Sequence, residues 1–384
     1  MSELTSPDRS RPDACPGALQ VHQAADGALS RARLPGGAIS PAQLQALADA
    51  SRDLAGGEIE LTSRGNVQLR AVTDPATFAA RLAAVGLLPS ATHERVRNIL
   101  ATPLSGRVGG FVDVRGWVAD VDAGLCADPD LADLPGRVLF TLDDGRGDVT
   151  ALRGDIGLHA VTPTEIALVL AGADHGVRLR PDDGVTALLG AARVLREIRG
   201  SQWRLHEIED GPAAVLQRLG LSVTAEVIDL AAPVTTGPIG WIDQPDGGVT
   251  LAAGLRFGVL PARLADFLVA VDRPITVTPW RSVLLHDLTE DMAEQVVRVL
   301  APMGLIFDAD SPWLQVSACA GQPGCAKSLT DVRADAVRAV ETETLPAEGR
   351  QHWAGCERRC GRPRGAVTDV VATDDGYRVD PPAR

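Results

Sequence analysis

Hydrophobic and polar positions follow the same order in two distant parts of the chain. Residues 26–44 match residues 246–264 without a gap at an offset of 220 positions. Residues 59–69 match residues 275–285 at an offset of 216 positions. Proline, alanine and leucine positions stay in register, which chance similarity between alanine-rich segments does not explain. The pattern therefore predicts a duplication in which two half-domains pair into one pseudo-symmetric unit.

Each copy predicts the same series of elements. In the first copy we expect a proline-led helix over Pro41–Asp53, an alternating strand over Ile59–Val67 and a helix over Ala76–Val85 that Gly86 closes. The corresponding elements of the second copy are expected at Pro261–Val271, Ile275–Val283 and Glu290–Leu300, and Gly304 closes the last. Strand and helix therefore alternate within about 65 residues, which is typical of an α+β half-domain.

The segments outside the repeat differ from it. Between the copies we expect strands at Val138–Leu142 and Asp148–Leu152 and helices at Val185–Glu197 and Gly211–Leu219. Proline and glycine in residues 232–248 indicate a linker. The resulting organisation is an N-terminal tail (1–24), a first half-domain (25–90), a middle α/β domain (91–231), a second half-domain (232–305) and a cysteine-bearing domain (306–384).

Composition narrows the function classes. The net charge of −13 argues against a general binder of nucleic acid or anionic membranes, which needs an excess of basic residues. The chain has one lysine, Lys327, and 36 arginines, so we expect arginine side chains to bind anions. No apolar run approaches a membrane span, and residues 1–13 lack the apolar centre of a signal peptide. We therefore expect a cytoplasmic protein, in which cysteines serve as ligands or free thiols.

Four cysteines near the C-terminus form two pairs. Cys319 and Cys325 are spaced C-x5-C, and Cys356 and Cys360 are spaced C-x3-C. Apolar residues at helical spacing over 329–340 predict a helix between the pairs, which would bring the chain back to one point. Four converging thiolates suit an iron–sulfur cluster or a zinc ion. The wide spacings and the glycines within them favour the cluster, and the other two cysteines of the chain are unpaired.

Several motifs in order resemble the nitrite/sulfite reductase family. They are LTSRGNVQLR at 61–70, ERVRNILATP at 94–103 and the two cysteine pairs, within a resemblance that spans residues 15–370. The resemblance implies two ferredoxin-like half-domains and two nitrite/sulfite-reductase-type α/β domains, the last with a [4Fe-4S] cluster on Cys319, Cys325, Cys356 and Cys360.

Within that family, residues 15–37, 278–285 and 318–336 are similar to the branch that acts on precorrin-3A in aerobic cobalamin biosynthesis. That likeness implies an O2-dependent monooxygenase that hydroxylates the macrocycle and closes a lactone. Electrons would reach the cluster from an NAD(P)H-linked donor protein, because the chain carries no phosphate-binding or dinucleotide glycine fingerprint. Because the internal duplication already supplies the pseudo-symmetric pair, we expect that the protein can be a monomer.

The motifs also assign site residues. Arg64 and Arg97 match two arginines of the reductase site and are our catalytic candidates. A flat macrocycle with many carboxylates needs an apolar slot and converging cations. Our substrate-binding candidates are Asn66, Gln68, Arg70, Asn98, Arg137, Trp280 and Arg281. Purely structural roles are the alternative for three of these residues. They are a solvated strand face for Gln68, a helix cap for Asn98 and a core position for Trp280.

The reductase site itself is incomplete. Arg137 and Leu139 stand where the reductases carry two lysines, and leucine can neither deliver protons nor hold an oxyanion. Sirohaem-dependent sulfite or nitrite reduction is therefore the second hypothesis, with sirohaem itself left open. A non-catalytic electron carrier or tetrapyrrole-binding protein is the third. An additional non-haem iron has no clear ligand motif, and His352 is its nearest candidate.

Overall fold

The computed structural model describes residues 13–230 and 236–382. The chain forms two compact units. We call residues 13–17, 33–37 and 87–230 the middle unit, and residues 18–32, 38–86 and 236–382 the duplicated unit. The predicted half-domains and the cysteine-bearing domain lie together in the duplicated unit.

Two five-stranded sheets of the duplicated unit exchange their edge strands. The first sheet has the order β1 (His22–Ala24), β2 (Gly27–Ala32), β5 (Val67–Val72), β4 (Glu58–Leu61) and β13 (Val259–Pro261). The second has the order β11 (Gly240–Asp243), β12 (Val249–Gly254), β15 (Ser282–Leu288), β14 (Ile275–Val277) and β3 (Ala38–Ile39). Strand β13 of the second copy pairs with β4 of the first, and β3 of the first copy pairs with β14 of the second. The predicted pseudo-symmetric pairing is confirmed.

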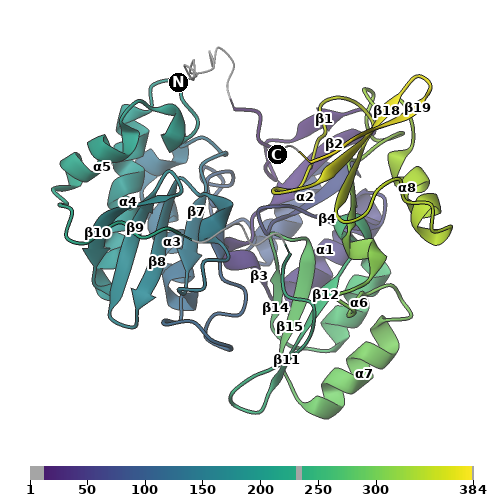
Figure 1. Ribbon diagram of the computed structural model, residues 1–384, viewed down its shortest axis with the longest axis horizontal. Helices are drawn as coiled ribbons and strands as arrows, with labels where there is room; N and C mark the ends of the chain where they lie inside the picture. Colours follow the sequence, from purple (N-terminus) through teal and green to yellow (C-terminus); the bar gives the residue numbers. More distant parts are fainter. Residues whose placement is uncertain (1–12, 231–235, 383–384) are drawn as a thin grey trace. The chain divides into compact units, whose positions relative to one another are not determined.

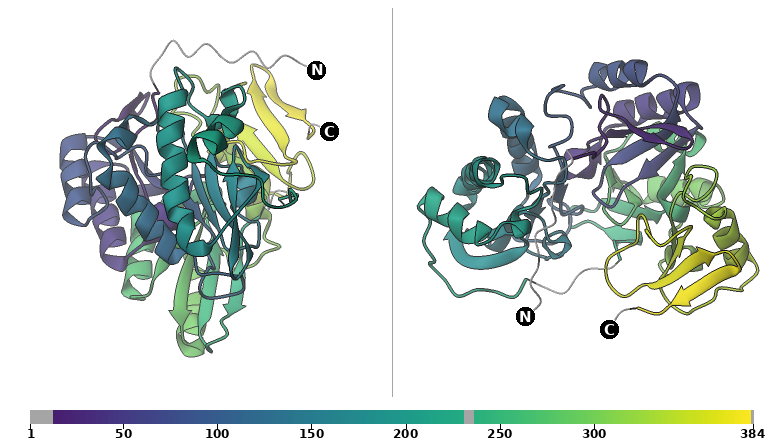
Figure 2. Two further views of the ribbon diagram at one scale, coloured as in Figure 1. Left: turned by 90° about the vertical axis from the view of Figure 1, so that its left-hand side faces the viewer. Right: turned by 90° about the horizontal axis from the view of Figure 1, so that it is seen from above.

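The predicted helices of both copies are present. They are α1 (Pro41–Leu54), α2 (Pro75–Ala84), α6 (Ala262–Ala270) and α7 (Glu290–Leu300). Helix α1 begins where Ser40 and Gln43 form a reciprocal capping box, which satisfies backbone donors that the first turn leaves open. Helices α1 and α6 pack against each other, so the two copies also meet through their helices (Figures 1 and 2).

The predicted strand in each copy is in fact a hairpin. Residues 62–66 turn the chain between β4 and β5, where the Thr62 amide donates to the Asn66 carbonyl and the Gly65 amide donates to the Thr62 carbonyl. Gly65 adopts a φ of 62° there, and Arg281 adopts the same φ of 62° at the corresponding turn of the second copy. The alternating pattern of apolar residues continues through the turn, which is why it suggested one strand. Strand β11 likewise lies inside the segment expected to be a linker.

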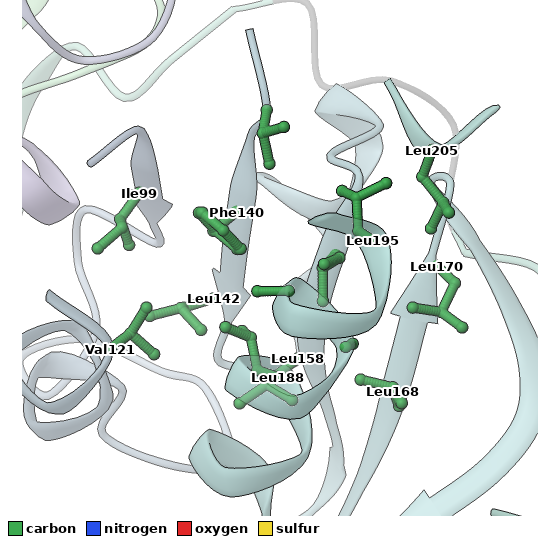
Figure 3. Packing of buried hydrophobic residues seen from close by; sticks show 14 of the residues in the cluster. Ile99, Val121, Phe140, Leu142, Leu158, Leu168, Leu170, Leu188, Leu195 and Leu205 are labelled. Carbon is green, nitrogen blue, oxygen red and sulfur yellow. The ribbon is translucent and has the colours of Figure 1, made fainter. Parts of the chain in front are cut away.

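The middle unit is a mixed sheet covered by helices. Strands β6 (Ile99–Ala101), β7 (Phe140–Asp143) and β8 (Ile156–Thr162) are parallel, and β9 (Glu165–Leu170) and β10 (Ala173–Leu179) continue the sheet in antiparallel order. Helices α3 (Arg115–Ala127), α4 (Pro181–Ile198) and α5 (Gly211–Leu219) complete the unit. Leu158 and Leu168 of the sheet and Leu188 of α4 belong to one buried apolar cluster (Figure 3).

One strand predicted in the middle unit is wrong. Residues 150–152 form a short 3-10 turn because the buried Asp143 carboxylate accepts backbone N–H groups from Gly145, Gly147, Val149 and Thr150. These bonds curl the loop around one side chain, so its amides are not free for a strand ladder.

The C-terminal part of the duplicated unit carries a separate four-stranded sheet, drawn in yellow tones in Figures 1 and 2. Its order is β16 (Val316–Ala318), β17 (Gln351–Ala354), β18 (Thr368–Thr373) and β19 (Gly376–Asp380). Helix α8 (Val332–Glu341) packs on β16 and β17, which confirms the helix expected between the cysteine pairs. Within the described residues, no helix is both long and apolar enough to cross a membrane.

Candidate functional site

The two cysteine pairs follow neighbouring parallel strands. Cys319 comes directly after β16, and Cys356 comes two residues after β17. Because β16 and β17 are parallel and adjacent, both pairs begin at the same edge of the sheet. Partial burial raises the pKa of the Cys360 thiol, Arg358 opposes that rise, and the other three thiols of the set add to it. The four thiols therefore lie close enough to influence one another.

The donor set of four thiols suits an iron–sulfur cluster or a zinc ion. Zinc draws its ligands to within about 2.0–2.3 Å of one atom. In residues 13–230 and 236–382, no three His, Cys, Asp or Glu side chains are grouped to hold a metal ion. The Gly355 amide donates a hydrogen bond of 3.3 Å to Cys319 Sγ, a contact that stabilises a thiolate. Four thiols on two loops, with an amide donor to one sulfur, are thus the candidate ligands, and the cluster itself stays a prediction.

A cross-strand ladder of polar side chains lies on the first sheet beside the cysteine loops. Gln68 is the cross-strand neighbour of both Arg31 and Glu60. Arg31 donates to Gln68 Oε1 at 2.7 Å, and Gln68 Nε2 donates to Glu60 Oε2 at 2.7 Å. The side-chain amide of the half-buried Gln68 is thus engaged on both sides, and its predicted role toward a substrate stays a prediction.

Glu60 links this ladder to helix α8. Arg333 of α8 donates to Glu60 Oε1 at 2.6 Å and, through Nε, to the Cys319 carbonyl at 3.2 Å. Burial alone would raise the pKa of Glu60, but the attraction of Arg333 and the neighbouring donors hold that pKa below its ordinary value. Glu60 is therefore a buried carboxylate that remains charged at neutral pH.

Arg70 contacts the first cysteine loop. Its guanidinium forms a fork with Asp26 at 2.8 and 2.9 Å and donates to the Gly324 carbonyl at 2.6 Å. The pairing of β2 with β5 shifts register opposite Leu29, where Arg70 and Ala71 form a bulge and Ala71 has a φ of 53°. A bulge re-aims the side chains that it carries, and here it directs Arg70 to the turn that holds Asp26.

Arg281 and Trp280 occupy the equivalent turn of the second copy. Arg281 Nη2 donates to the Gly361 carbonyl at 3.0 Å, next to Cys360. Burial lowers the pKa of Arg281, and Glu60 partly compensates. The half-buried Trp280 lies against Gly237, where an added Cβ would come within 2.9 Å of the indole. The contacts of Arg70 and Arg281 thus bring both residues to the cysteine loops, while their predicted role toward a substrate stays a prediction.

His352 is fully buried on β17. Its Nδ1 lies 3.0 Å from Ser317 Oγ, and its Nε2 has no hydrogen-bond partner. Burial and the nearby cation of Arg281 lower its pKa to about 3, so the ring is neutral. The residue is therefore part of the core under the cysteine loops, and its role toward an additional iron stays a prediction.

Arg64 and Asn66 lie in the hairpin turn between β4 and β5. Asn66 is buried and its amide donates to Thr62 Oγ1 at 3.1 Å, while Arg64 is half-buried. Both residues are in the duplicated unit, in the loop that starts the strand bearing Gln68 and Arg70. Their assigned roles stay predictions.

The remaining candidates belong to the middle unit. Arg97 is buried and forks onto Asp122 at 2.6 and 2.7 Å, while its third nitrogen faces the Leu87 carbonyl at 3.4 Å. All three nitrogens thus have protein partners, which is the arrangement of a residue that holds its unit together. Arg137 is half-exposed, 3.7 Å from Asp13 and 4.9 Å from the ring centroid of Trp203.

Asn98 is not a helix cap. It precedes strand β6, and its Nδ2 donates to the Arg95 carbonyl at 2.9 Å and to the Gly136 carbonyl at 2.8 Å. That pair of bonds ties two loops of the middle unit together. Leu139, which the resemblance aligns with the second lysine of the reductases, is buried.

Sequence reasoning missed Asp26, Glu60 and Arg333. Each is an isolated charge in a strand, turn or helix, where the ordinary expectation is a solvated residue. Glu60 alternates with Ile59 and Leu61, a pattern that normally assigns the charge to the solvent side of a sheet. Only the packing of the cysteine loops over that side shows that these residues belong to the site.

Comparison with known proteins agrees with this geometry. Residues 22–81 match the nitrite/sulfite reductase ferredoxin-like half domain. A precorrin-3B synthase of Sinorhizobium sp is 28% identical, over 96% of this chain and 82% of the relative. A sulfite reductase [ferredoxin] of Mycolicibacterium paratuberculosis is also 28% identical, over 87% of this chain and 68% of the relative. A ferredoxin–nitrite reductase of Synechococcus elongatus is 25% identical, over 92% and 78%.

The fold has a solved counterpart. The structure of the Mycobacterium tuberculosis NirA protein aligns with a TM-score of 0.72 at 19% identity, over 92% of this chain and 74% of that one. The mixed α+β architecture expected from the duplication and the motifs is therefore confirmed. The resemblance carried by the motifs is confirmed as well, since relatives of both kinds match most of the chain.

Proposed function

Since this chain is related to precorrin-3B synthase and to the sulfite and nitrite reductases, we propose that it is an O2-dependent monooxygenase of the precorrin-3B synthase type. Its substrate would be precorrin-3A or a closely related tetrapyrrole. The relatives are oxidoreductases, so an enzyme of that general class is the common ground of the comparison. The oxygenase chemistry is the part that this proposal adds.

The proposal rests on the residues that align with the two lysines of the reductases, which are Arg137 and Leu139. Leu139 is buried in the middle unit, and Arg137 contacts Trp203 and Asp13. Multi-electron reduction of sulfite or nitrite consumes many protons and needs groups that supply them. A buried leucine cannot supply them, whereas hydroxylation of a carbon needs far fewer protons. The replacement favours oxygenation over anion reduction.

The chain's own residues would divide the work. Cys319, Cys325, Cys356 and Cys360 would hold the [4Fe-4S] cluster. When bound, that cluster supplies electrons one at a time. Arg64, in its hairpin turn, would bind a carboxylate of the macrocycle through its planar fork. The polar edge of the substrate would meet Asn66 in the same turn.

The reaction balances with one reductant. One oxygen atom of O2 forms the new C–O bond of the hydroxyl group, and the other leaves as water, at the expense of two electrons and two protons. An acetate carboxyl of the substrate then closes the lactone by adding across a ring double bond. Its O–H bond and the π bond break, a C–O and a C–H bond form, and no further electrons are consumed. An NAD(P)H-linked donor protein would supply the electrons. The exposed Lys327 and Arg358 beside the cysteines give this acidic chain a local basic surface that suits an acidic donor.

Anaerobic purification with iron, sulfide and absorption analysis tests the proposal first. About four iron and four sulfide per chain without sirohaem bands, followed by transfer of one 18O atom from labelled O2 into precorrin-3A, is the expected result. Sirohaem bands together with sulfite or nitrite turnover would overturn it in favour of the reductase. A cluster that exchanges electrons but yields no oxygenated product would instead indicate an electron carrier.

A further inference from the structure

We propose that Arg70, Arg281 and Arg333 are positioning residues that hold the cysteine loops by their main-chain carbonyls and keep positive charge beside the cluster. The inference rests on the proposed function in one respect, namely that the four cysteines hold a [4Fe-4S] cluster. It assigns these arginines to the protein's own cysteine loops rather than to a substrate. Each arginine contacts a carbonyl at or next to a different cysteine.

The first cysteine loop is held at both ends. Arg333 donates to the carbonyl of Cys319 itself at 3.2 Å. Arg70 donates at 2.6 Å to the carbonyl of Gly324, which belongs to the peptide bond that joins Gly324 to Cys325. The two contacts therefore fix the backbone at the first and at the last residue of the C-x5-C segment.

Both arginines are themselves fixed by carboxylates of the first sheet. Asp26 accepts the Arg70 fork at 2.8 and 2.9 Å, and Glu60 accepts from Arg333 at 2.6 Å. An arginine held by a carboxylate loses little further freedom when it binds a carbonyl. The first half-domain thus supplies rigid anchors for a loop that lies more than 250 residues away in sequence.

Arg281 holds the second cysteine loop, and its backbone conformation is unusual. It donates to the Gly361 carbonyl, one residue beyond Cys360. Its φ of 62° lies in the left-handed region, which a residue with a side chain seldom adopts. The first copy has Gly65 at this position with the same φ. A non-glycine residue persists in such a conformation where the surroundings require its side chain, and sites of function are where this happens.

Glycines leave room for the guanidinium groups. A Cβ on Gly324 would lie 3.2 Å from Arg70 Nη2, and a Cβ on Gly361 would lie 3.1 Å from Arg281 Nη2. A Cβ on Gly258 would lie 2.8 Å from the stem of Arg281. Larger residues at these places would push the arginines off their carbonyls. Gly324 and Gly361 therefore leave room for the arginine contacts, a reason that spacing alone does not reveal.

The charges of the group do not cancel. Asp26 pairs with Arg70 and Glu60 pairs with Arg333, whereas Arg281 donates to a main-chain carbonyl. One net positive charge therefore remains on these five side chains. Positive charge stabilises the reduced cluster, which carries one more electron than the oxidised form. Loss of any of the three arginines removes a positive charge, and loss of Glu60 removes a negative one.

The test compares Arg70→Gln, Arg281→Gln and Arg333→Gln in the full-length, anaerobically purified protein. The matched control is Arg81→Gln, because Arg81 pairs with Asp53 on an exposed surface of the same unit. Iron and sulfide per chain and the cluster's midpoint potential, from a titration followed by electron paramagnetic resonance, are the readouts.

We expect each site variant to lower the ratio of reduced to oxidised cluster at a fixed potential about tenfold, which is 59 mV for one electron. Arg81→Gln should leave both readouts at the wild-type values. Arg281→Lys keeps the charge and should restore the potential. Glu60→Gln should shift the potential in the opposite direction, which a merely loosened loop would not do.

One variant distinguishes the loss of the charge from a failure to fold. Arg281→Gly introduces the residue that the first copy carries at this left-handed position, so it should fold and still show the lowered potential. If all site variants match Arg81→Gln in iron content and potential, the inference is overturned while the proposed function stands. If the wild-type chain itself binds no iron and sulfide, the proposed function fails and the inference fails with it.

Discussion

Replacement of Asp148 by asparagine should stabilise the protein at pH 8. The Asp148 carboxylate is buried in the middle unit, where it accepts from Thr102 Oγ1 at 2.8 Å and from the Val149 amide at 2.7 Å. Burial, and then the nearby Asp143, raise its pKa from 3.8 to about 7, although Thr102 and Arg146 oppose the rise. The oxygen of asparagine can accept the same two hydrogen bonds, so the substitution removes the charge and keeps the contacts.

The magnitude follows from the pKa of the folded and unfolded states. Because the folded pKa lies above the unfolded one, the favourable contribution is complete below about pH 4 and is lost as the pH rises through about 7. A shift of this size corresponds to an upper limit of about 4 kcal/mol. Relaxation of the neighbouring donors, which are arranged around a carboxylate, offsets part of this limit. We therefore expect about half of it, roughly 2 kcal/mol at pH 8 and less than 1 kcal/mol at pH 5.

Urea unfolding of the wild type and Asp148→Asn at pH 5 and pH 8, followed by tryptophan fluorescence, measures this difference. Asp113→Asn is the control, because Asp113 is an exposed residue whose pKa Arg115 lowers. It should change stability little and in the destabilising direction. Equal effects of Asp148→Asn at both pH values, or a loss of stability at pH 8, would refute the reasoning.

Three further predictions concern the cysteines, a buried ion pair and a helix cap. Cys325→Ser should abolish stoichiometric iron and sulfide, measured after anaerobic purification, whereas Cys126→Ser should retain both; equal content in the two variants would contradict the ligand assignment. Arg97→Ala leaves Asp122 without its fork in a partly buried position, so urea unfolding should show a loss of about 2–3 kcal/mol; a change under 1 kcal/mol would show that the pair is weakly coupled. Ser40→Ala removes a capping box and should lower the unfolding free energy by about 1 kcal/mol, and an unchanged midpoint would count against the cap.

Local signals in the sequence located most helices well. Helix α7 spans the predicted residues, and α5 begins at Gly211 and ends at Leu219, as predicted. Caps, prolines and glycines act within a few residues of the position they punctuate, so they can be read without the tertiary structure. The hairpins were missed because the alternation of apolar residues continues across their turns, and residues 150–152 because one carboxylate, Asp143, collects the loop amides.

The candidate site divides along the same line. The four cysteines could be predicted as ligands from their two spacings, because the chemistry of thiolates restricts what such a set can bind. The neighbours of these cysteines in space could not be predicted in this way. Arg70 and Gly324 are separated by 254 positions, and no local pattern relates them. Whether Gln68 faces water or Glu60 likewise depends on what packs over the sheet.

The sequence by itself determined the duplication and the cysteine set, since each is a property of residue identity and order. The tertiary structure decided which charges are buried, which arginines meet which carbonyls and how the two copies exchange their edge strands. The physical reason is that hydrogen bonds and charge interactions depend on distance in space. A charged residue read from sequence is by default a solvated one until the fold removes its water.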